Sequence, residues 1–166
     1  QLADTQVFYG DIADIWIGDG YLSFSAYDTS KPTLPESYWF ATTEPLTYTG
    51  KLNLSSLMTT LGMHTDQGDI ISCSKLGDRY CLSGILHEDA TNSSNSYLVV
   101  ITLSEDLQHI DAAISEAMSQ GLAIDEIFQE EQRQIICYST RTETYQQQAH
   151  FAIVSLDAQG KPQLSP

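Results

Sequence analysis

Short apolar runs, separated by Gly, Asp and Pro, recur along the chain with the lengths and spacing of β-strands. The first set covers residues 13–17, 21–27 and 37–43, with Gly18-Asp19-Gly20 between the first two runs. Gly and Asp tolerate the positive φ angles of a tight turn, so this set predicts a hairpin followed by a third antiparallel strand.

Two later stretches repeat this arrangement. Gly77-Asp78 separates two runs in the second stretch, and Glu131-Gln132-Arg133 forms the turn of the third. The strands expected there are 70–75, 80–86 and 97–103, then 134–140 and 150–156. We expect a short fourth strand after each set, which makes the protein mainly β.

The repetition extends to individual residues. Gly10-Asp11-Ile12 matches Gly68-Asp69-Ile70, and Ser23-Phe24-Ser25 matches Cys81-Leu82-Ser83 and then Cys137-Tyr138-Ser139. Insertions fall in the polar loops while the apolar runs keep their spacing, as expected when packed strands are the repeated unit. We therefore predict a single array over residues 1–166, with three units of about 56 residues at approximately 10–62, 68–120 and 124–166.

One stretch has the spacing of a helix. Leu107, Ile110, Ala113, Ile114 and Ala117 recur at helical intervals, and Gly121 follows as a C-cap. This pattern predicts one short helix between the second and third units. A fainter version of the pattern lies between Leu52 and Leu61.

The third unit carries the motif from which a family resemblance can be drawn. Ile135-Ile136-Cys137-Tyr138-Ser139 is followed by a polar loop and by His150–Gly160, an apolar strand that ends in Leu-Asp-x-x-Gly. This arrangement resembles the blades of bacterial β-propeller repeat proteins. The resemblance implies blade-like antiparallel sheets and transfers no active site, because propellers host unrelated functions.

Three blades do not close a ring, since propellers typically have about 4 to 8 blades. Closure would come from a homodimer or from the blades of another protein, unless the chain is a fragment of a longer protein. The alternative fold is a β-trefoil, whose threefold symmetry needs no partner.

Charge limits the classes of partner. The chain has 22 Asp and Glu against 7 Lys and Arg, for a net charge of −15. Such a chain repels phosphate backbones, so nucleic acid is not expected as a partner. No apolar run approaches the roughly 20 residues that span a bilayer, so membrane insertion is not expected. Gln1 suggests a processed start, and hence a secreted or periplasmic protein.

The cysteines allow two interpretations. Cys73 and Cys81 flank the Gly77-Asp78 turn, where a cross-strand disulfide would form if the register placed them opposite each other. Cys81 and Cys137 also align with Ser23, which favours small buried residues in strands. Three cysteines at these spacings form no zinc motif.

No catalytic motif was found, and no cofactor or metal is expected. The four histidines are scattered, and none lies in a recognised nucleophile or metal-binding motif. Trp16, Tyr38 and Trp39 crowd the first unit and are the candidate binding residues, because Trp and Tyr stack on sugars and anchor protein interfaces.

The sequence thus favours a non-catalytic binding or assembly module that completes its propeller with a second copy or a partner protein. The alternative is a fragment or subunit of a propeller enzyme, for example one that acts on glycans.

Overall fold

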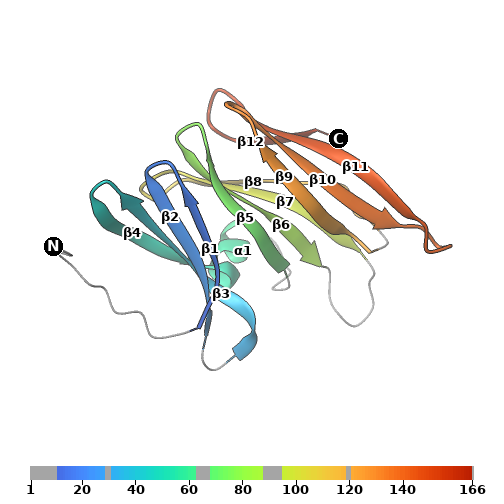
Figure 1. Ribbon diagram of the computed structural model, residues 1–166, viewed down its shortest axis with the longest axis horizontal. Coiled ribbons are helices and arrows are strands. Elements are labelled where there is room, and N and C mark those ends of the chain that lie inside the picture. Colours follow the sequence, from blue (N-terminus) through green and yellow to red (C-terminus); the bar gives the residue numbers. More distant parts are fainter. Residues whose placement is uncertain (1–10, 29–30, 63–67, 88–94, 119–120, 166) are drawn as a thin grey trace.

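Twelve β-strands and one helix make up the described part of the computed structural model, residues 11–28, 31–62, 68–87, 95–118 and 121–165. The strands are β1 (Asp11–Gly18), β2 (Tyr21–Asp28), β3 (Lys31–Thr43), β4 (Leu46–Asn53), β5 (Gly68–Leu76), β6 (Arg79–His87), β7 (Ser96–Leu103), β8 (Ile110–Ile114), β9 (Ala123–Gln129), β10 (Arg133–Arg141), β11 (Gln147–Leu156) and β12 (Pro162–Ser165). They form three four-stranded antiparallel sheets, each built from four consecutive strands. Figure 1 shows the sheets following one another across the molecule in sequence order.

This architecture confirms the prediction of a mainly β protein with three blade-like sheets. The β-trefoil alternative is wrong. In the described part of the chain, each strand pairs only within its own sheet, so the strands close no barrel.

The turns follow from local sequence. Gly20, with φ of 79°, lies in the turn between β1 and β2, and Gly77, with φ of 61°, occupies the matching turn between β5 and β6. An L-residue with a Cβ atom rarely adopts such angles, so glycine at these positions sets both hairpins.

The helix does not lie between the second and third units, where the stronger helical pattern predicted it. Helix α1 (Leu54–Thr60) follows β4, within the fainter pattern, and Asn53 caps it by accepting a hydrogen bond from the Ser56 amide at 3.2 Å. Its Leu57 and Met58 are buried in the core. Among the described residues, no helix is long and apolar enough to cross a membrane.

The helix predicted between the second and third units is wrong, because residues 110–114 form β8 instead. Leu107 has φ of 61°, an angle that no α-helix accommodates. The Ser104 amide donates to the His109 carbonyl, which closes a reversal that brings β8 onto the edge of β7. Pairing with an existing strand therefore overrides the local helical periodicity.

Each sheet carries the same irregularity in its first strand. In each sheet, one residue of the first strand has no partner and lies between the partners of two consecutive residues of the second strand. This is the geometry of a β-bulge. The extra residues are Ala13, Ile71 and Asp125. When the three sheets are aligned on their bulges, Cys137 occupies the position equivalent to Ser25 and Ser83.

Cys137 therefore does not share the position of Cys81 and Ser23, as the sequence alignment had it. The residue at that position is Ile135, two places earlier in the chain. A shift of two residues keeps side chains on the same face of a strand, so the apolar pattern does not reveal it.

Two hydrophobic cores separate the three sheets. The first includes Tyr38 and Phe40 of the first sheet, packed with Leu82 of the second and with α1. The second joins Cys81 and Val100 on the other face of the second sheet to buried residues of the third. Among the described elements, the middle sheet is thus covered on both faces, and each terminal sheet on one face.

Of the two interpretations of the cysteines, the Cys73–Cys81 disulfide does not form, and both cysteines are free and buried. The register pairs Cys73 with Leu82 and Ser74 with Cys81. Because successive side chains of a strand point to opposite faces, the two thiols lie on opposite faces of the sheet. Cys73 lies in the first core and Cys81 in the second.

Candidate functional site

Two of the three predicted binding residues, Trp16 and Tyr38, lie on the inner face of the first sheet. Their rings stack, with centroids 6.4 Å apart, and Trp16 is partly buried against the first core. Tyr38 is only 1% exposed. Burial is the largest factor that raises the pKa of its hydroxyl. Both side chains contribute mainly to the contact with the second sheet.

Trp39 lies on the opposite face of the same sheet. It stacks on Phe24, with ring centroids 5.7 Å apart, and contacts Tyr48 at 5.4 Å. The ammonium of Lys51 lies 5.1 Å from its ring centroid, within range of a cation–π interaction. The three predicted residues therefore do not form one surface.

Trp39 belongs to an apolar face of the first sheet that no other described element covers. Alternation along β1 and the register with β2 and β3 place Ile15, Ile17 and Phe24 on the same side as Trp39. Ile17 is 75% exposed and Ile15 is 56% exposed. We call this surface the first-sheet outer face. Its apolar members are Ile12, Ile15, Ile17, Leu22, Phe24, Trp39, Leu46 and Tyr48.

The third sheet presents a second apolar face at the other end of the molecule. Phe151 is 63% exposed and Phe128 is 52% exposed, on the side away from the second core. We call this the third-sheet outer face. Its apolar members are Phe128, Ile135, Cys137, Phe151 and Ile153.

The bulge alignment shows that both faces have buried counterparts within the same molecule. On the first-sheet outer face, half-buried Phe24 corresponds to Leu82 and Ile136, both of which are fully buried against a preceding sheet. On the third-sheet outer face, Phe151 corresponds to Tyr38 and Val100, which are buried against a following sheet. The first-sheet outer face therefore corresponds to the side of a sheet that packs on the preceding sheet. The third-sheet outer face corresponds to the side that packs on the following sheet.

A cleft lies between the second and third sheets, near their last strands. One part, of about 470 Å³, includes Leu98, Met118, Tyr138, Ala152 and Leu164, and Ser115 and Glu116 also line it. A second part, of about 380 Å³, shares Met118 and Tyr138 and is also lined by Thr140, Gln148 and His150. We call the two parts together the inter-sheet cleft.

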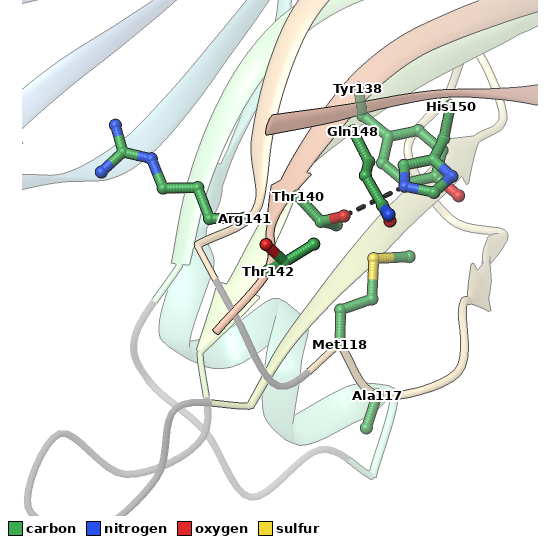
Figure 2. Close-up of a pocket in the computed structure, with 8 residues that line it drawn as sticks. All are labelled: Ala117, Met118, Tyr138, Thr140, Arg141, Thr142, Gln148 and His150. Carbon is green, nitrogen blue, oxygen red and sulfur yellow. Dashed lines mark hydrogen bonds between the residues drawn. The ribbon is translucent and has the colours of Figure 1, made fainter. Parts of the chain in front are cut away.

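Figure 2 shows the second, smaller part of the inter-sheet cleft. Thr140 Oγ1 and His150 Nε2 are hydrogen-bonded at 3.0 Å, and the His150 ring stacks on Tyr138 with centroids 5.0 Å apart. Arg141 also lines the cleft, but its guanidinium points away from the other side chains drawn. The cleft therefore places the hydrogen-bonding groups of Thr140, Gln148 and His150 beside apolar side chains.

Burial perturbs the pKa of several ionisable groups among the described residues. In the part of the chain that the structure describes, no three His, Cys, Asp or Glu side chains come together as metal ligands. Burial, and secondarily the nearby Asp14 carboxylate, raises the pKa of Asp69 at the contact of β1 with β5. Burial also raises the pKa of the Cys73 and Cys81 thiols to about 12, which makes both of them poor nucleophiles.

Sequence reasoning did not identify the outer faces or the cleft. The available signal was a run such as Ile15-Trp16-Ile17, in which both faces of a strand are apolar although the strand belongs to a terminal sheet. Comparison with protein-family models, with curated proteins and with solved structures gives no match.

Proposed function

We propose that this chain is a non-catalytic assembly module, and that its two outer faces bind those of a second copy. The third-sheet outer face of one copy packs on the first-sheet outer face of the next. The observation that carries the proposal is the exposure of Phe151, since its counterparts Tyr38 and Val100 are 1% and 0% exposed. Apolar faces of this extent on an acidic chain mark an interaction surface.

The direction of stacking supports a head-to-tail contact. The face of the second sheet that carries Leu82 is turned toward the first sheet, and the matching face with Ile136 is turned toward the second. All three sheets are thus stacked in the same sense. A further sheet added in that sense would place the third-sheet outer face against a first-sheet outer face.

Two copies joined twice in this way would close a ring. Three sheets from each copy make six, within the range of about 4 to 8 blades in β-propellers. The resemblance of the third unit to bacterial β-propeller blades supports the same arrangement. A two-copy ring has no free outer face, which would limit further growth.

Charge opposes the association. Each copy has a net charge of −15, so two copies repel each other at low ionic strength. Salt screens this repulsion, with a Debye length of about 8 Å at physiological ionic strength. We therefore expect the dimer to become more stable as salt is raised.

The test is the solution mass of the purified chain by light scattering, over a range of concentration and salt. We expect a dimer, and we expect Ile17→Glu and Phe151→Glu each to yield monomers with an unchanged circular dichroism spectrum. Tyr145→Glu is the control, because Tyr145 is 85% exposed at the β10–β11 turn. A wild-type chain that stays monomeric under all these conditions would exclude self-association and leave a partner protein as the occupant of the faces.

A further inference from the structure

We propose that Arg133 of one copy forms an ion pair with Glu44 of the next copy, and that this pair sets the orientation of the head-to-tail contact. The inference rests on the proposed function, because it concerns the contact between the third-sheet and first-sheet outer faces. Arg133 is the first residue of β10, and Glu44 lies in the turn between β3 and β4.

The position of Arg133 recurs in the other two sheets. Tyr21, Arg79 and Arg133 are the first residues of β2, β6 and β10, and the bulge alignment makes them equivalent. Tyr21 belongs to the first core, and Arg79 lies two residues before Cys81 of the second core. Side chains two residues apart in a strand share a face, so this position is turned toward the following sheet.

Arg79 contacts the turn between the third and fourth strands of the following sheet. Its Nη2 atom donates to the Gln159 carbonyl at 3.3 Å, in the β11–β12 turn. A Cβ atom at Gly160 would lie 2.6 Å from Arg79 Nε, so the backbone of this turn passes directly against the guanidinium. The Thr102 hydroxyl also donates to the Gly160 carbonyl, at 3.4 Å.

Tyr21 lies beside the corresponding turn at the contact between the first and second sheets. The Lys75 ammonium is 5.8 Å from the Tyr21 ring centroid and 2.9 Å from a carboxylate oxygen of Glu105. Glu105 belongs to the β7–β8 turn of the second sheet. In both contacts within the chain, the residue at this position therefore lies near the third-to-fourth-strand turn of the next sheet.

In a second copy, the turn that would meet this side chain is the one between β3 and β4. Leu46 ends this turn, and the bulge alignment makes it equivalent to Pro162 at the end of the β11–β12 turn. Pro162 is buried, and its strand contacts the second sheet, whereas Leu46 is 59% exposed. A preceding sheet would therefore cover this corner of the first sheet, where Glu44 is exposed.

Arg133 would be the cation at a corner that is otherwise acidic. Its guanidinium pairs with Glu130 of its own chain, 49% of its side chain is exposed, and Glu131 is exposed in the same turn. Asp19 of the next copy would adjoin Glu44, because a backbone hydrogen bond of 3.1 Å joins the β1–β2 turn to the end of β3. A guanidinium has five N–H donors, so Arg133 can bind a second carboxylate while it keeps Glu130. Without this guanidinium, only carboxylates would meet here.

The other charged side chains of the two outer faces lie away from this corner. On the third-sheet outer face, Glu126 lies in the middle of β9, and Arg141 ends β10 at the opposite end from Arg133. On the first-sheet outer face, the Lys51 ammonium lies over the Trp39 ring, at the middle of β3 and β4. These groups therefore neither replace nor oppose the proposed pair.

The test measures the dimer dissociation constant by sedimentation velocity at one pH and ionic strength. We expect Arg133→Glu and Glu44→Arg each to weaken the dimer by about tenfold or more, because a closed ring contains the pair twice and each substitution replaces attraction by repulsion. The double variant has the opposite charges exchanged, and should recover the wild-type constant within about threefold.

A matched variant controls for the charge of the whole chain. Glu44→Arg makes the net charge of −15 less negative, which by itself would favour association. Glu143→Arg makes the same change in net charge at an exposed position in the β10–β11 turn, and should not weaken the dimer.

Failure of the pair and failure of the assembly give different results. A wild-type chain that forms no dimer would overturn the proposed function and the pair with it. A wild-type dimer that tolerates Arg133→Glu or Glu44→Arg, or a double variant as weak as the single variants, would overturn the pair and leave the assembly. Equal weakening by Glu143→Arg would also overturn the pair, because it would show a general effect of charge.

Discussion

The three cysteines differ in burial despite their similar strand contexts. Cys73 and Cys81 lie in the two cores, and burial raises the pKa of both thiols to about 12. Cys137 is half-buried on the third-sheet outer face. The sequence alignment grouped Cys81 with Cys137, but the bulges separate them by two positions.

The buried thiols predict a loss of stability at alkaline pH. Their ordinary pKa is about 9, so in the unfolded chain they release protons above that pH, while the folded chain keeps them protonated up to about pH 12. The free energy of unfolding should therefore be unaffected by these thiols below pH 9 and fall as the pH rises toward 12. Urea denaturation between pH 7 and pH 11 measures this dependence.

The control for this prediction is a Cys73→Ala, Cys81→Ala double variant. Tyrosines and lysines also titrate in the alkaline range, so only the difference between the two proteins reports on the thiols. An equally steep decline in both would contradict the prediction.

Gly84 illustrates a residue whose identity follows from its three-dimensional neighbours. It pairs with Ile70 at the bulge of the second sheet, where a Cβ atom would clash with the backbone oxygen of Asp69. The bulge alignment places Ala26 and Tyr138 at the same position in the other sheets. Close approach of β5 and β6 therefore requires glycine in one sheet only, which the repeat pattern does not reveal.

At the scale of elements, short-range patterns were reliable where chain neighbours form the contacts. The hairpin β1–β2 and the strand β7 lie where the apolar runs and turn residues predicted them. The pattern at Leu107–Met118 was misleading because β7, which precedes it in the chain, presents an edge on which residues 110–114 pair as β8. A hydrogen-bonded edge outweighs the small free-energy differences of helix propensity.

Helix α1 gives a prediction at this scale. Asn53 Oδ1 accepts the Ser56 amide hydrogen bond, so Asn53→Ala should lower the free energy of unfolding by about 1 kcal/mol. Asn53→Asp keeps the acceptor and should restore most of this loss. Urea denaturation of the three proteins provides the comparison, and an equal loss in both variants would argue against capping.

At the scale of the whole molecule, the proposed association of two copies through the outer faces has two possible arrangements. A head-to-tail contact joins two different faces, whereas a face-to-face dimer would join one face to itself. The same-sense stacking of the three sheets favours the first arrangement. The two arrangements respond differently when variants are mixed.

Mixing Ile17→Glu chains with Phe151→Glu chains should restore a mixed dimer. The intact third-sheet outer face of the first variant can bind the intact first-sheet outer face of the second, which leaves one of two contacts. We expect weaker association than in the wild type but clear complex formation, measured by sedimentation velocity with one variant labelled. A face-to-face dimer predicts that Phe151→Glu or Ile17→Glu alone has no effect, and that mixing rescues nothing.

The sequence by itself determined the β class, the three units, the tight turns and the strong negative charge, because strand periodicity and turn chemistry depend on near neighbours in the chain. It also contained Trp16, Tyr38 and Trp39, but not the fact that Trp39 faces away from the other two. Only the tertiary structure decided which faces are buried and where β8 replaces a helix. Each of these depends on contacts between segments far apart in sequence, which local periodicity does not encode.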